Sequence, residues 1–150
     1  MQILSCTPAR MPLTKQPFSP QVDQILLPSA PAISEIRCLR LVGMRAMDTF
    51  PVSLAAALKK LEHLDLAGNE GFTCFPTALT KIRTLCSLDL SYNDKIMLQF
   101  RDAHLLAGFA DLQCLRFVQE ASVSHVTGDI FKALAVMRPD IVLVLTASVD

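Results

Sequence analysis

Four side chains that could take part in nucleophilic chemistry occupy equivalent places in a segment that the chain repeats. Each is the third residue of a nine-residue stretch; in chain order they are Cys38, His63, Ser87 and Cys114. If consecutive stretches form neighbouring strands, Cys38 lies beside His63, within reach of a hydrogen bond that could activate the thiol. The pattern therefore raises a thiol-dependent enzyme using Cys38 and His63 as a remote alternative.

The other parts of a thiol active site are missing from the sequence. No glycine turn or helix start that could supply oxyanion donors is predicted beside Cys38 and His63, and the surface of a strand is open to water. Cys38 and Cys114 are expected three strand spacings apart, roughly 14 Å, which is too far for a disulfide. We therefore interpret these residues as small side chains on an exposed face, and we expect no enzymatic activity.

Charged residues follow the same period, at the fifth place of each stretch. They are Arg40, Asp65, Asp89 and Arg116. Adjacent strands lie about 4.8 Å apart, so each aspartate can pair with a neighbouring arginine. Two carboxylates on adjacent strands suggest glycosidase chemistry, but the arginines would keep both ionised and nothing predicts a walled cleft. Two interpretations remain: a charged recognition stripe, or solvated pairs worth under about 1 kcal/mol.

The repeat itself defines the elements that position these side chains. Leu61-Glu-His-Leu-Asp-Leu-Ala-Gly-Asn69 returns as Leu85-Cys-Ser-Leu-Asp-Leu-Ser-Tyr-Asn93, and both fit the pattern L-x-x-L-x-L-x-x-N. In a strand, the leucines at places 4 and 6 point to one side, whereas places 3 and 5 point to the other. The stretches that begin at 36 and 112 keep apolar residues at the leucine places, with Ile36 and Phe117 among them. Both lose the asparagine, with Met44 and Glu120 in its place.

These motifs resemble those of the leucine-rich-repeat family, and the match covers residues 36–145. The resemblance implies an α/β fold: a solenoid with a curved parallel β-sheet inside and helices and extended segments on the convex side. It also implies that a protein partner binds the concave face, and that the amides of Asn69 and Asn93 bond the backbone of neighbouring coils. Family members include intracellular adaptors, regulatory subunits and substrate receptors of ubiquitin ligases. The alternative function is therefore a structural fragment of a larger protein of this kind.

The rest of the chain is assigned around the repeats. Residues 1–18 are predicted to be irregular, although 1–6 could form a lone strand, and residues 19–35 form a cap with a short helix over 20–27 followed by a turn. The repeats begin near 36, 61, 85 and 112, a final strand lies near 141, and 146–150 form a tail. The first two return segments are predicted to be extended, followed by a short turn. Helices are predicted over 102–108, capped by Asp102, and from Thr127 onward.

Composition limits the classes of function. Apolar residues make up 51% of the 150-residue chain and charged residues 19%, which indicates a packed fold. The 14 basic and 14 acidic residues cancel, so no net field favours nucleic acid or an anionic membrane. Five cysteines without paired spacing indicate reduced thiols and no zinc site. No apolar run is long enough for a signal peptide or a membrane span. We expect an intracellular protein, in the cytoplasm, without cofactor or metal.

The expected partner-binding surface consists of strand residues that face away from the core and of the turn residues that follow them. Tyr92 is expected to be its anchor, because it is the only tyrosine in a chain without tryptophan. The surface comprises Arg40, His63, Asp65, Ser87, Asp89, Tyr92, Arg116 and Gln119. Five short strands expose roughly 400–500 Å², whereas a standard interface uses about 800 Å² per partner. A partner must therefore also contact turns or ends, unless the chain belongs to a longer array.

Overall fold

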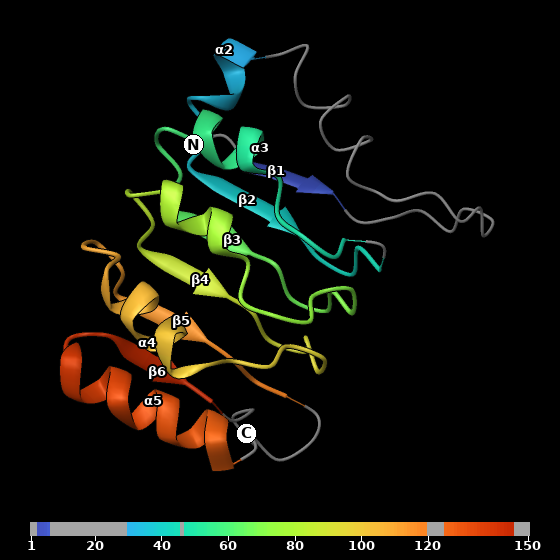
Figure 1. Cartoon of the computed structure of the whole chain (residues 1–150). Helices are drawn as coiled ribbons and strands as arrows, with labels where there is room; N and C mark the ends of the chain where they lie inside the picture. Colours follow the sequence, from blue (N-terminus) through green and yellow to red (C-terminus); the bar gives the residue numbers. More distant parts are fainter. Residues whose placement is uncertain (1–2, 7–29, 46, 120–124, 146–150) are drawn as a thin grey trace, which may run out of the picture.

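Six parallel strands form one sheet, and their order in space follows their order in the chain (Figure 1). The computed structural model describes residues 3–6, 30–45, 47–119 and 125–145. The strands are β1 (Ile3–Cys6), β2 (Cys38–Leu41), β3 (His63–Asp65), β4 (Ser87–Asp89), β5 (Cys114–Arg116) and β6 (Val142–Val144). Because neighbours are parallel and consecutive, each connection returns from the end of one strand to the start of the next.

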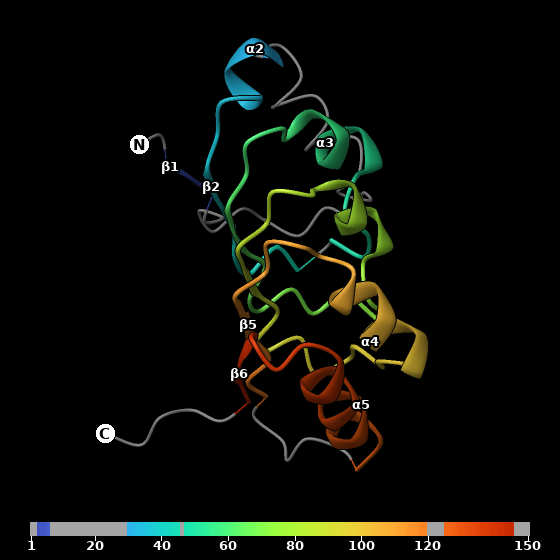
Figure 2. The same cartoon turned by 90° about the vertical axis from the view of Figure 1, so that its left-hand side faces the viewer.

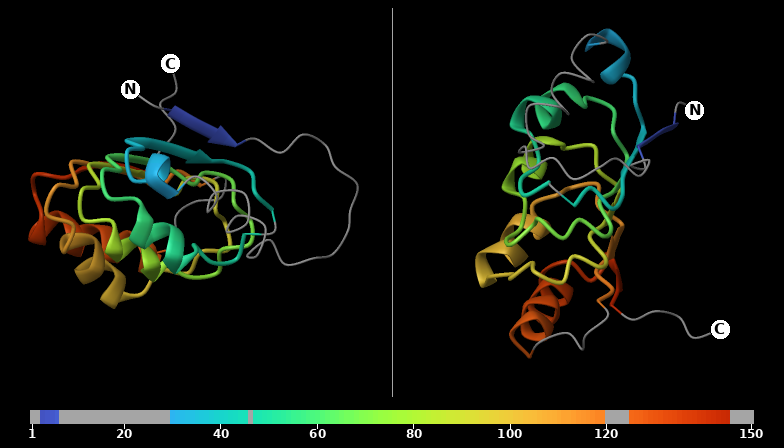
Figure 3. Two further views of the ribbon diagram at one scale, coloured as in Figure 1. Left: turned by 90° about the horizontal axis from the view of Figure 1, so that it is seen from above. Right: turned by 90° about the vertical axis from the view of Figure 1, so that its right-hand side faces the viewer.

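The connections carry helices of four to six residues in the N-terminal half of the sheet and of 8 and 13 residues in the C-terminal half. They are α2 (Ala30–Ile33), α3 (Val52–Ala57), the 3₁₀-helix η2 (Thr77–Lys81), α4 (Phe100–Ala107) and α5 (His125–Met137). Helices α3, η2, α4 and α5 all lie on one side of the sheet (Figures 2 and 3). No described helix covers the other side. The chain is thus an α/β protein whose parallel sheet alternates with helices and has one face, the uncovered face, on which no described helix packs.

Leucines at alternate places build the core between the sheet and the helices. Leu39, Leu64, Leu88 and Leu115 occupy equivalent register positions on β2 to β5, and each is at most 2% exposed. Complete burial of one such side chain stabilises the fold by about 1.5–3 kcal/mol. The identical register of these strands places the four side chains in one continuous stack. Each repeat, meaning a strand with its return segment, therefore completes the core of its neighbours.

Two buried asparagines connect the turns that follow the strands. The Asn69 Nδ2 donates to the carbonyl oxygens of Leu41 and Leu66 at 2.7 and 2.6 Å, and its Oδ1 accepts from the Met44 N–H at 2.8 Å. The Asn93 Nδ2 makes the corresponding donor bonds one repeat later, to the carbonyl oxygens of Leu66 at 3.0 Å and Leu90 at 2.8 Å. Both side chains are fully buried. The expected bonding of these amides to the neighbouring coil is therefore confirmed.

The connecting segments differ in detail from the sequence prediction. Helix α3 and η2 lie in the first two return segments, where an extended stretch and a short turn were predicted. Helix α4 begins at Phe100 after the cap residue Gln99, and Asp102 accepts from the Gln99 N–H at 2.7 Å from inside the first turn. The prediction of Asp102 as the cap was therefore wrong. Thr127 likewise lies within α5, which begins at His125.

The two ends of the sheet settle assignments that the sequence left open. Ile3–Cys6 forms strand β1 and pairs with β2, so the prediction of an irregular segment over 1–18 was wrong for these four residues. The helix predicted over 20–27 lies outside the described residues, and Ala30–Ile33 is helical where a turn was expected. In β6, Leu143 packs against the core whereas Val142 is exposed. Leu143 therefore faces inward.

A close backbone contact at Gly71 and the side chain of Arg138 hold successive repeats against one another. A Cβ atom on Gly71 would lie 2.3 Å from the Met47 carbonyl oxygen, so only glycine fits there. The Arg138 guanidinium donates to the carbonyl oxygens of Ala107 and Phe109 at 3.1 and 2.7 Å. It also binds the Asp140 carboxylate at 2.6 Å, and this hydrogen bond lowers the pKa of Asp140. Arg138 thus ties the segment after α5 to the end of α4.

Candidate functional site

The residues that suggested nucleophilic chemistry form one row across the uncovered face. Cys38, His63, Ser87 and Cys114 are register partners on β2 to β5. His63 is exposed and the other three are half-buried. Within the described ranges, no group of three or more His, Cys, Asp or Glu residues is arranged to hold a metal ion. The sheet therefore sets Cys38 beside His63, as the repeat predicted, on a surface formed by strand side chains.

A second row carries the charges, and it forms the predicted ion pairs. The Arg40 Nε lies 3.0 Å from the Asp65 Oδ2, and the Arg116 Nε lies 3.2 Å from the Asp89 Oδ2. About half of each arginine side chain is exposed, at 54% and 51%, against 23% and 22% for the aspartates. The row therefore presents two guanidinium groups to solvent on either side of two more deeply placed carboxylates.

The second oxygen of each aspartate accepts a hydrogen bond from the turn that follows its strand. Asp65 Oδ1 accepts from the Ala67 N–H at 3.0 Å, and Asp89 Oδ1 accepts from the Ser91 N–H at 2.8 Å. Each carboxylate thus uses one oxygen for a turn N–H and the other for an arginine of the neighbouring strand.

Tyr92 occupies a place in the turn where the backbone favours glycine. Its φ angle is 56°, and the equivalent residues of the two preceding turns are Gly43 at 70° and Gly68 at 69°. A left-handed conformation costs a residue with a Cβ roughly 1–2 kcal/mol. The side chain of Tyr92 is nonetheless 45% exposed. The chain therefore displays an aromatic ring at a position where its backbone is strained.

The remaining predicted residues lie on or next to the same surface. Arg40, His63, Asp65, Ser87, Asp89 and Arg116 belong to β2 to β5, and Gln119 is half-buried in the segment after β5. Two further turn residues, Ser91 and Val118, are inside, because each is at most 3% exposed. The Ser91 hydroxyl accepts from the Val118 N–H at 3.0 Å, so it supports the turn.

A pocket beside Tyr92 was not predicted from the sequence. It lies between the turns after β3 and β4 and has a volume of ≈ 450 Å³. Its lining residues are Gly68, Glu70, Tyr92, Asp94 and Lys95. A signal was present in the repeat, because an acidic residue follows the asparagine in both copies, as Asn69-Glu70 and Asn93-Asp94. Only the stacking of the two turns brings these carboxyl groups to one pocket.

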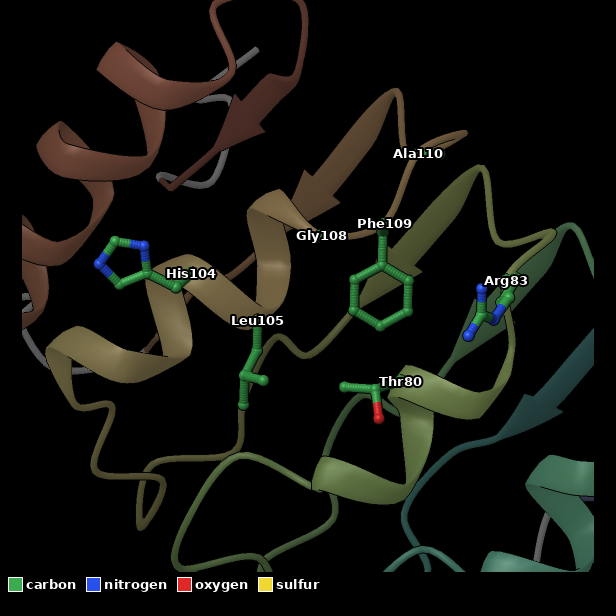
Figure 4. A pocket seen from close by; sticks show the side chains of 7 residues that line it. All are labelled: Thr80, Arg83, His104, Leu105, Gly108, Phe109 and Ala110. Carbon is green, nitrogen blue, oxygen red and sulfur yellow. The ribbon is translucent and has the colours of Figure 1, made fainter.

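A second cavity lies on the helical side of the sheet, between η2 and α4 (Figure 4). Its volume is ≈ 320 Å³, and Thr80, Leu105 and Phe109 contribute to its wall, with Arg83 at one side. The imidazole of His104 points away from these side chains (Figure 4). The Thr80 hydroxyl donates to the Thr77 carbonyl oxygen. This cavity thus presents an apolar wall and one cation, without a pair of groups arranged for proton transfer among its described lining.

One cysteine of the sheet has an altered acidity. Burial raises the pKa of the Cys86 thiol, and the negative charges of Asp111 and Glu62 raise it further. A raised pKa lowers the thiolate fraction at neutral pH, so Cys86 is a poor nucleophile. Cys38, Cys74, Cys86 and Cys114 are all free thiols.

The described part of the chain contains no helix with the length and apolar character that crossing a bilayer requires. Comparison of the sequence with models of known protein families gives no match, and comparison with curated proteins gives no match either.

Proposed function

We propose that this chain is a leucine-rich-repeat solenoid that binds a protein partner. The partner would use the uncovered sheet face and the turns after β3 and β4. One observation carries the proposal: an exposed tyrosine in a strained left-handed conformation stands next to a face of paired charges. Tyrosine and arginine are the side chains most enriched at the energetic centres of interfaces, and both are displayed here.

The small area of the sheet supports a partner that also contacts the turns. Six strands about 4.8 Å apart span roughly 24 Å, and their three or four residues extend over about 10–13 Å. The resulting area of roughly 250–300 Å² is less than half of what a standard interface uses on one partner. Tyr92 and Gln119 lie directly beyond the strands, so they extend the surface in the required direction.

Capture of a partner from native lysate, with mass spectrometry of the retained proteins, tests the proposal. The informative variant combines His63→Ala with Tyr92→Gly, because neither side chain makes a hydrogen bond among the described residues and glycine suits the backbone at 92. A control, Val136→Ser, changes a side chain that is 83% exposed on α5, away from the sheet face.

We expect a partner retained by the wild-type chain and by Val136→Ser but lost from the double variant, whose melting temperature stays within a few degrees of the wild type. A partner that binds all three chains equally would contradict binding at the sheet face. Absence of any partner, with a folded monomer, would favour the alternative of a structural piece of a larger leucine-rich-repeat protein.

A further inference from the structure

The pocket beside Tyr92 is open because of the residue types in the neighbouring turns. Gly68 holds the equivalent place one coil earlier and Gly43 two coils earlier, and neither has a side chain. The turns are stacked in direct contact, since the Gly68 N–H donates to the Ser91 carbonyl oxygen at 2.9 Å. Tyr92 therefore lines the pocket together with Gly68, which adds no side chain that could fill it. This vacancy gives a ligand access to the region beside the ring.

The charged side chains that line this pocket form no ion pair with other described residues, unlike the charged side chains on the strands. Glu70, Asp94 and Lys95 are exposed, and none of them forms an ion pair with another residue in the described ranges. Asp65 and Asp89, by contrast, are each bound to an arginine and to a turn N–H. Two carboxylates against one ammonium group leave the pocket with a net negative charge.

A tyrosine ring and two free carboxylates together favour one class of ligand group. The face of an aromatic ring attracts a cation, and carboxylates bind a guanidinium through paired hydrogen bonds. Arginine meets both requirements, because its planar group stacks on a ring while its N–H groups remain free for carboxylates. A lysine ammonium is a more strongly hydrated point charge and meets only the electrostatic requirement.

We propose that the pocket formed by Gly68, Glu70, Tyr92, Asp94 and Lys95 receives an arginine side chain of the partner. The guanidinium stacks on the Tyr92 ring, and the carboxylates of Glu70 and Asp94 accept its hydrogen bonds. This inference rests on the protein-binding function proposed above. It adds the chemistry of the partner: a basic segment that reaches beyond the strand ends of the sheet.

The test uses the full chain, labelled with ¹⁵N, and follows its backbone amide resonances by NMR. The probes are N-acetyl-arginine amide, its neutral isostere N-acetyl-citrulline amide, and N-acetyl-glutamate amide. We expect the arginine probe to shift the resonances of Gly68, Tyr92 and Asp94 with a dissociation constant in the millimolar range. We expect the citrulline probe to bind about tenfold more weakly or not at all, which corresponds to 1.4 kcal/mol or more.

Variants assign the roles within the pocket. Tyr92→Phe should retain binding, and Tyr92→Gly should abolish it. Glu70→Gln with Asp94→Asn should weaken it about tenfold. Lys95→Gln should strengthen it severalfold, because Lys95 is the one cation among the described lining residues and it repels the ligand. Binding should also weaken in about 0.5 M NaCl, since these charges are exposed.

Three results would overturn the inference: no shifts with arginine, equal shifts with citrulline, or stronger binding of the glutamate probe through Lys95. The outcome is separate from that of the capture experiment. If the His63→Ala/Tyr92→Gly double variant loses the partner but the arginine probe does not bind the pocket, the protein-binding function is supported and this inference is refuted. An arginine-binding pocket without a protein partner would refute the function instead.

Discussion

Asn69→Ala should destabilise the protein by about 3 kcal/mol, and this value follows from the bonds that the side chain makes. The Met44 N–H loses its acceptor at 2.8 Å and the Leu41 oxygen loses a donor at 2.7 Å. The Leu66 oxygen keeps a second donor, the Asn93 Nδ2, at 3.0 Å. Two buried groups therefore lose a partner, at about 1–3 kcal/mol each. The loss is a large part of the roughly 5–15 kcal/mol that stabilises a domain.

The second asparagine supplies an internal comparison. Within the described residues, the buried Asn93 Oδ1 accepts no hydrogen bond, so Asn93→Ala deprives carbonyl oxygens of donors but leaves no N–H without an acceptor. We therefore expect Asn93→Ala to cost less than Asn69→Ala. Gln113→Ala is the control, because Gln113 is an exposed residue and exposed positions change stability within about 0.5 kcal/mol.

Urea unfolding followed by far-ultraviolet circular dichroism measures all three free energies of unfolding. At about 2–4 °C per kcal/mol for a chain of this size, the Asn69 variant should also melt roughly 10 °C lower. A loss below about 1 kcal/mol for Asn69→Ala, or a larger loss for Asn93→Ala, would refute the view that the buried amide ladder couples the coils.

Three further predictions follow from the structure. Gly71→Ala should cost about 1–3 kcal/mol or more by thermal melting, because its Cβ would strike a backbone carbonyl oxygen; Gly128→Ala, with nothing within 4 Å, should not destabilise. Arg138→Met should lower stability in urea by about 2 kcal/mol, since three part-buried carbonyl oxygens lose charged donors; an unchanged midpoint would contradict this. Iodoacetamide at pH 8 should label the exposed Cys74 well before Cys86, whose raised pKa keeps it protonated; equal rates would exclude that difference.

Much of the arrangement could be predicted because the repeat is local in the sequence. The spacing of the leucines determines which side chains face the core, and the fixed offset between copies determines the register of β2 to β5. Arg40 with Asp65 and Arg116 with Asp89 were predicted as pairs for this reason, and both pairs form. A periodic pattern is sufficient wherever a contact joins equivalent places of consecutive coils.

The helical segments were less predictable, because their boundaries depend on contacts outside the repeat. Asp102 is of a residue type that favours the N-cap position. It lies instead inside the first turn of α4, where its carboxylate accepts a hydrogen bond from the Gln99 N–H. Phe100, the first residue of α4, is 59% exposed. Ile3–Cys6 has no repeat of its own and becomes a strand by pairing with β2. These boundaries and exposures depend on contacts with the neighbouring repeat.

The sequence by itself determined the alternation of strand and return segment, the inward face of each strand, and the row of charges on the other face. Tertiary structure alone decided that two further acidic residues, one after each asparagine, come together. Asp65 and Asp89 are bound by arginines across the strands, whereas Glu70 and Asp94 meet at the pocket beside Tyr92. The reason is physical: periodicity defines the direction of a side chain, but a pocket exists only where stacked turns leave a space between them.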